Sequence, residues 1–151
     1  MRHEQTGFDA ASVARSGFAV RTRRFGISTD EFRDALRHYA SGITVITGAD
    51  EQGLVGFTCQ AFQSVSAEPP LVSFTVQKTS TTYPRIRATG SFAVNVLTQD
   101  QQHVSRQFSR PGTDKWSGIG WSRTQAGNPV LYQTMLWLDC RIWAEHDGDG
   151  G

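Results

Sequence analysis

The sequence predicts one domain that is mainly β-structure with a few helices. Residues 71–76, 91–97 and 135–146 alternate apolar and polar side chains with a period of two, which is typical of strands buried on one face. The helical patterns are short and lie between the strand patterns. At 151 residues, of which 38% are hydrophobic, the chain is long enough for one sizeable core.

The N-terminal residues 1–27 are predicted to be a flexible extension. They contain five arginines and scattered glycines but no sustained apolar period, and termini without anchoring contacts are usually disordered. The pair Arg23-Arg24 is also found in twin-arginine export signals, but no apolar segment follows it here, so we do not expect export. The domain is predicted to span residues 28–151.

The domain begins with a predicted helix and hairpin. The sequence Ser28-Thr29-Asp30-Glu31 is a capping box, which opens a helix that Gly42 ends. Residues 43–47 form a β-prone strand, 49–53 an acidic turn containing glycine, and 54–59 the hairpin partner.

A polar stretch follows the strand at 71–76. It reads Lys78-Thr79-Ser80-Thr81-Thr82 and leads into a predicted helix over 83–88, which Gly90 ends. Hydroxyls, backbone N–H groups and a lysine at a helix start favour a phosphate site. An ordinary Ser/Thr helix cap is the alternative interpretation. Neither a nucleotide P-loop nor a Rossmann glycine motif is present in the sequence to take this role.

Two further elements carry candidate ligand contacts. Asn95, on the strand at 91–97, points either at a ligand or at water. A helix over 99–108 places Val104 and Phe108 four residues apart as an apolar pair. Arg106 on this helix is either a ligand contact or a solvated arginine.

The C-terminal third is predicted to contain a long loop and a last strand. The loop, 111–128, is rich in glycine and proline, and its Trp116 and Trp121 either cover a site or pin the loop to the core. The strand at 135–146 runs into a turn at 147–151. A strand without a return partner leaves backbone groups unpaired, so we expect the chain to be truncated at its C-terminus.

Composition excludes several functions. The net charge of +1 gives no electrostatic basis for binding nucleic acid or an anionic membrane, and no apolar run has the length of a membrane span. Cys59 and Cys140 lie apart, with no CxxC pair and no histidine cluster, so no metal site is expected. Buried reduced thiols indicate a cytoplasmic protein.

Four segments together resemble the flavin reductase family: SGITVIT (41–47), GFTCQAFQSVSAEPPLVSF (56–74), KTST (78–81) and GSFAVNVL (90–97). The similarity covers roughly residues 32–148. The resemblance implies a split β-barrel of the FMN-binding flavin reductase type, here with its last strands missing. It implies a homodimeric NAD(P)H-dependent reductase that supplies reduced FMN or FAD by diffusion to a partner flavin-dependent monooxygenase.

The resemblance also implies site residues. Contacts to the flavin ring edge are carried over to Thr58, Cys59, Gln60 and Ala61, and contacts to the phosphate to Lys78, Ser80, Thr81 and Thr82. Weaker candidates are Ser64, Ser66, Asn95 and Arg106. No catalytic acid or base is assigned, because the hydride passes between two cofactors, the flavin and NADH or NADPH.

The family's nicotinamide-contacting turn, H-D-x-G-D-H, is matched only by His146-Asp147-Gly148. The second histidine is absent, so activity of this chain is uncertain from its sequence. Two alternatives stay open at this level: a flavin- or haem-binding split-barrel module without turnover, and an inactive fragment.

Overall fold

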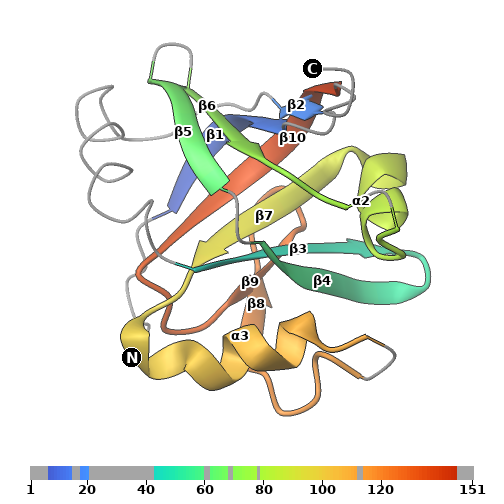
Figure 1. Ribbon diagram of the computed structural model, residues 1–151, viewed down its shortest axis with the longest axis vertical. Helices are drawn as coiled ribbons and strands as arrows, with labels where there is room; N and C mark the ends of the chain where they lie inside the picture. The colour runs from blue at the N-terminus through green and yellow to red at the C-terminus, as the bar shows by residue number, and fades with distance from the viewer. Residues whose placement is uncertain are drawn as a thin grey trace.

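The computed structural model describes residues 7–14, 18–20, 43–59, 62–67, 70–77, 79–111 and 114–145. An eight-stranded sheet has the order β4-β3-β7-β10-β2-β1-β6-β5, and β8 and β9 form a separate two-stranded sheet (Figure 1). The strands are β1 (Gly7–Ala14), β2 (Phe18–Val20), β3 (Thr44–Asp50), β4 (Gly53–Cys59), β5 (Phe62–Ala67), β6 (Pro70–Phe74), β7 (Ser91–Val96), β8 (Trp121–Arg123), β9 (Pro129–Leu131) and β10 (Leu136–Glu145). The helices are α2 (Tyr83–Thr89), the short 3-10 helix η1 (Gln99–Gln101) and α3 (Gln102–Ser109).

The hairpin, the two long strands and the later helices agree with the sequence-based predictions. β3 and β4 pair antiparallel from Thr44↔Cys59 to Asp50↔Gly53, and the turn lies at Glu51 and Gln52. β7 pairs with β3 on one edge and with β10 on the other. α2 ends at Gly90, whose φ of 75° is left-handed and suits glycine. The predicted mainly β fold with few helices is therefore confirmed.

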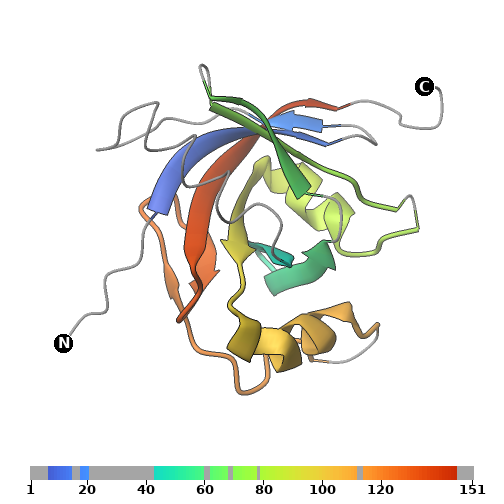
Figure 2. The same ribbon diagram turned by 60° about the vertical axis from the view of Figure 1, so that its left-hand side comes forward.

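The structure departs from the prediction of a flexible extension in two segments. β1 pairs in parallel with β10 over most of its length, from Gly7↔Trp137 to Ala14↔Glu145, and β2 pairs antiparallel with both strands. Figure 2 shows β1 beside β10. The expected open edge of β10 is thus covered, because its backbone donors and acceptors find partners in β1. The predicted helix after Ser28 lies outside the described residues.

Two other segments differ from expectation. The polar stretch after Gln60 contains the strand β5, which pairs with β6 from Phe62↔Phe74 to Ala67↔Pro70. The predicted long loop contains β8, which pairs with β9. Sequence patterning missed both strands because β5 carries mixed polar residues and β8 is only three residues long.

The sheet β4-β3-β7-β10 has a buried cluster on each face. One cluster contains Ile46, Phe74, Phe92 and Leu138, with Tyr83 and Ile86 from α2. The other contains Val45, Leu97, Val104, Phe108 and Leu131. α3 covers the second face together with β8 and β9 (Figure 1). The two clusters explain why Ala93 and Asn95, on the opposite face of β7 from Phe92, are also fully buried.

Among the described helices, none has both the length and the apolar character that a membrane crossing requires.

Candidate functional site

A cleft of about 800 Å³ runs along the outer edge of β4. Its volume lies within the range of small-molecule and cofactor pockets. Among the described strands, β4 is the last of its sheet, so none of them engages the backbone groups along its outer edge. The lining residues come from β4 (Leu54–Cys59), from the segment after β6 (Thr75, Val76, Gln77, Thr79, Ser80, Thr81, Thr82), from α2 (Arg85) and from the end of α3 and its following loop (Phe108, Ser109, Pro111, Asp114, Lys115, Trp116).

The cleft has two walls because successive side chains of β4 point to opposite faces. Val55 and Cys59 belong to the cluster that contains Phe74 and Tyr83, and the ring of Phe57 lies 6.2 Å from that of Phe74. On the other face, a Cβ built at Gly56 would lie 2.6 Å from Phe108 Cε1, in α3. Gly56 thus permits close packing of α3 on the strand.

The first wall, which we call the hydroxyl wall, consists of Thr75, Thr79, Ser80, Thr81, Thr82 and Arg85. It lies on the β6 and α2 side of β4. Ser80 Oγ accepts a hydrogen bond of 3.0 Å from Tyr83 N in the first turn of α2. The alternative of a serine helix cap is therefore realised for Ser80, although Thr82 occupies the cap position itself. The hydroxyl of Thr81 is exposed and that of Thr82 half-buried.

Arg85 anchors this wall to the β3–β4 hairpin. Its Nε donates to Asp50 Oδ2 at 2.7 Å, its Nη2 pairs with Asp50 Oδ1, and Nη2 also donates to Gly53 O at 3.2 Å. The Arg85 guanidinium holds the pKa of Asp50 at about 2, below its ordinary value of 3.8. The charge of Arg85 is thus largely matched by Asp50.

The second wall, which we call the α3 wall, consists of Phe108, Ser109, Pro111, Asp114, Lys115 and Trp116. Thr58 Oγ1 donates to Ser105 O of α3 at 2.7 Å, which ties this wall to β4. The Trp116 ring packs edge-on against Phe108 at 5.1 Å and against Trp121 at 6.0 Å. Both predicted roles of the tryptophans hold in part, since Trp121 packs on the core cluster and Trp116 packs there while also lining the cleft.

Two buried polar atoms of the cleft have no hydrogen-bond partner among the described residues. They are Thr75 Oγ1, on the hydroxyl wall, and Trp116 Nε1, on the α3 wall. A third such atom, Ser73 Oγ on β6, is not among the cleft-lining groups. Unpaired buried polar atoms are costly, and both of these atoms are closed off from solvent. The apolar rings and the hydroxyls of the lining suit a flat heteroaromatic ligand with a phosphate.

The structure brings together five of the residues implied by the resemblance. Thr58 and Cys59 lie on β4, and Ser80, Thr81 and Thr82 lie on the hydroxyl wall. The Cys59 thiol is buried, with its sulfur 3.9 Å from Thr75 O. Ser64 and Ser66 lie on β5, where the structure describes the backbone only. Gln60, Ala61, Lys78 and His146 lie outside the described residues.

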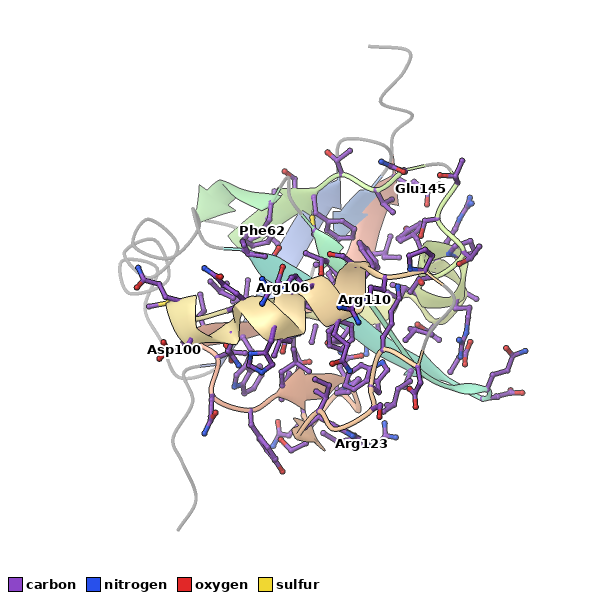
Figure 3. The ribbon with its side chains drawn as sticks, turned by 60° about the horizontal axis from the view of Figure 1, so that its bottom comes forward. Phe62, Asp100, Arg106, Arg110, Arg123 and Glu145 are labelled. Carbon is purple, nitrogen blue, oxygen red and sulfur yellow. The ribbon has the colours of Figure 1, made fainter. Side chains whose placement is uncertain are left out.

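The structure does not bring Asn95 or Arg106 to the cleft. Asn95 is fully buried: its Nδ2 donates to Val45 O and Thr47 Oγ1, and its Oδ1 accepts from Leu131 N. It is fully buried because its partners on β3 and β9 enclose it. Arg106 is exposed on α3 (Figure 3) and is not among the cleft-lining residues.

Asn95 forms part of a buried polar network beneath β8 and β9. We define the network as Thr47, Ser91, Asn95, Thr124, Asn128 and Asp139. Asp139 Oδ1 accepts from Thr124 Oγ1 at 2.8 Å and from Asn128 Nδ2 at 3.0 Å. Burial raises the pKa of the Asp139 carboxyl. Thr47 Oγ1 also donates to Pro129 O at 2.6 Å, which fastens β9 to β3.

Thr75, Arg85 and Lys115 are among the cleft residues that sequence reasoning missed. Arg85 follows the Ser/Thr run by three residues, a spacing that places it one turn into the predicted helix and that could have identified it. Lys115 carries no local signal, because its position depends on tertiary contacts of the loop after α3. Among the described residues, no cluster of histidine, cysteine or acidic side chains is arranged to hold a metal ion.

The chain matches the family described as flavin reductase like domain over residues 36–151. It is 42% identical over 117 residues to the flavin-dependent monooxygenase reductase subunit HsaB of Mycobacterium tuberculosis, covering 78% of this chain and 63% of that protein. It is 36% identical over 118 residues to the NADH:FMN oxidoreductase of Rhodococcus erythropolis, covering 78% of this chain and 62% of that protein. The chain thus spans less than two thirds of the length of these relatives.

The chain is also similar in fold to solved structures of this kind. Nitrilotriacetate monooxygenase component B from Mycobacterium thermoresistibile superposes with a TM-score of 0.66 at 36% identity, covering 76% of this chain and 65% of that one. The NADH:FAD oxidoreductase SgcE6 of Streptomyces globisporus C-1027, in complex with NAD and FAD fragments, superposes with a TM-score of 0.64 at 29% identity, covering 78% and 74% respectively.

Proposed function

The chain belongs to the flavin reductase like domain family, and from this premise we propose that it binds oxidised FMN or FAD in the β4 cleft and reduces it with NADH or NADPH. The observation that carries the proposal is the pairing of a hydroxyl wall with unpartnered buried polar atoms around one free strand edge. A bound flavin supplies the hydride-accepting chemistry that no side chain offers.

The residues of the cleft bind and orient the ligand in this proposal. The hydroxyls of Thr81 and Thr82 donate to the flavin phosphate, and the backbone edge of β4 with Thr58 and Cys59 faces the polar ring edge. The partly exposed rings of Phe57 and Trp116 exclude water and supply apolar contact area for the ring, and the buried Phe108 supports Trp116 from behind. We keep Lys78 in the phosphate site as a prediction, because it adjoins Thr79 in sequence.

The reduced flavin is proposed to serve a partner monooxygenase. The relatives include a reductase subunit of a flavin-dependent monooxygenase, and BorF, a 26% identical solved relative, is the flavin reductase component of a two-component tryptophan halogenase. We propose delivery by diffusion, which requires no docking surface on this chain.

We also propose a homodimer located in the cytoplasm. Ile43, Tyr132 and Met135 are large apolar residues about half exposed, as expected if a second subunit covers them. Cys59 and Cys140 are buried thiols that are not joined in a disulfide, in keeping with a reducing compartment. Light scattering tests the dimer.

Binding and turnover measurements on the full chain test the proposed function. Titration with FMN should quench flavin fluorescence saturably, whereas riboflavin, which lacks the phosphate, should bind at least about tenfold more weakly because the charge-assisted bonds to the hydroxyl wall are lost. NADH oxidation should then depend on added flavin. A chain that binds neither FMN nor FAD would overturn the proposal, and a Soret band after haem addition with no flavin binding would assign the cleft to haem.

A further inference from the structure

Lys115 is a cleft-lining cation without a described counter-ion. Its Nζ donates to Gly56 O of β4 at 3.2 Å, and burial lowers the pKa of the ammonium. No carboxylate of the described residues pairs with it, whereas Arg85, across β4, is paired with Asp50. A partly buried ammonium with one hydrogen bond keeps two donors available and gains from a bound anion.

The loop around Lys115 is held by specific hydrogen bonds. Gln107 Nε2, on α3, donates to Lys115 O and to Ser117 O, both at 2.8 Å. Asp114 Oδ1 accepts from Trp116 N at 3.1 Å, so this carboxylate stabilises the turn. Trp116, on the same turn, also lines the cleft, and its buried Nε1 has no partner among the described residues. The Lys115 ammonium, with its single hydrogen bond to Gly56 O, therefore lies on a wall that specific contacts hold in place.

We propose that Lys115 is a specificity-determining residue that binds the diphosphate of a dinucleotide ligand. This inference rests on the proposed function. The hydroxyl wall on the other face of β4 already offers the groups for the phosphate that FMN and FAD share, so the anion at Lys115 is a phosphate that FMN lacks: the adenylate phosphate of FAD or the diphosphate of the nicotinamide dinucleotide. Two ligands of this reaction carry a diphosphate, FAD and the nicotinamide dinucleotide, and both present the same chemistry to the ammonium.

Binding measurements on Lys115→Gln test the proposal. Glutamine keeps a donor for Gly56 O but removes the charge. If FAD is the source, its dissociation constant should rise about tenfold or more, with that of FMN unchanged. If the nicotinamide donor is the source, the KM for NADH should rise by the same factor, with the KM for reduced nicotinamide mononucleotide unchanged. Lys115→Arg should restore the affected constant in part.

A labelling experiment gives a readout independent of activity. The sequence contains only two lysines, Lys78 and Lys115, so modification by an amine-reactive reagent is easily mapped by mass spectrometry. FAD or NADH should protect Lys115, while FMN alone should leave it as reactive as in the free protein. Arg110→Gln is the matched control, because Arg110 ends α3 on the same side but does not line the cleft (Figure 3).

The outcomes separate this inference from the proposed function. Failure of the unaltered chain to bind any flavin would overturn both. Normal FMN binding with no effect of Lys115→Gln on FAD or NADH would overturn the Lys115 proposal alone. Equal weakening of FMN and FAD would also overturn it, since Lys115 would then act on a group that both flavins share. An equal effect of Arg110→Gln would show that net charge, and not a site, is responsible.

Discussion

The β4 cleft and the buried polar network differ in how their polar groups are satisfied. In the network, Asn95 uses both ends of its amide, and Asp139 accepts two hydrogen bonds from neighbouring side chains. In the cleft, Thr75 Oγ1 and Trp116 Nε1 have no described partner, and Lys115 has no described counter-ion. Buried polar residues that satisfy one another, as in the network, support the fold. We propose that the polar residues lining the cleft bind the ligand.

The largest expected effect is a loss of stability on substitution of Asn95, which belongs to the buried polar network and not to the cleft. Asn95→Ala removes the side-chain hydrogen bonds to Leu131 N, Val45 O and Thr47 Oγ1 and opens a small cavity, so we expect a loss of about 3 kcal/mol or more in the free energy of unfolding. Denaturant unfolding measures it. Flavin affinity of the folded fraction should be unchanged. A loss of flavin affinity without a loss of stability would place Asn95 in the site after all.

The second prediction concerns two cleft residues, Thr81 and Thr82, whose substitution should change ligand affinity but not stability. Thr81→Val with Thr82→Val removes two hydroxyls that are not needed for folding, so stability should change by less than about 1 kcal/mol. The FMN dissociation constant should rise roughly 10- to 100-fold, as expected for lost hydrogen bonds to a charged group. Isothermal titration measures it. Riboflavin affinity should stay constant, and an equal loss for riboflavin would mean that the hydroxyls contact the ring instead.

These two regions also show what sequence can and cannot predict. The period-two patterns located β7 and β10, but alternation says only that one face of a strand differs from the other. It does not say what covers the second face, so the alternation predicted that Asn95 reaches ligand or water, whereas β9 covers it. The contiguous stretch from Lys78 to Thr82 was predicted as a phosphate site; Thr79 to Thr82 line the cleft, and phosphate binding there stays a prediction.

Most of the α3 wall escaped prediction for a different reason, although Trp116 was a candidate to cover a site. Lys115 and Trp116 reach the cleft because Gln107, Asp114 and Phe108 hold their loop, and none of these contacts leaves a periodic signal. The pairing of β1 with β10 was missed because residues 7–14 show no clean alternation.

The smallest predicted effect concerns acid stability. The pKa of Asp50, lowered by Arg85 to about 2, means that this pair stabilises the fold above about pH 4 and that the contribution is lost as the pH falls toward 2. Asp50→Asn should therefore lower Tm slightly at pH 7, and the difference from the parent should vanish near pH 2.

The pKa of Asp139 is raised by burial, so the stability of the fold depends on this carboxyl in the opposite direction. Its contribution to the free energy of unfolding is largest at low pH and weakens as the pH rises above about 4. Asp139→Asn should remove that decline, and identical pH profiles for both variants would contradict this account.

The central claim is that the cleft, with its unsatisfied polar groups, holds the flavin while the buried network only supports the fold. A ¹H–¹⁵N correlation spectrum tests it directly, because the indole N–H of Trp116 and the side-chain amides of Asn95 and Asn128 give separate signals, with Trp116→Phe identifying the first. On titration with FMN, we predict that the Trp116 indole signal shifts saturably and that the two asparagine signals stay in place. FMN binding that moves the asparagine signals and leaves the Trp116 indole unmoved would contradict the claim.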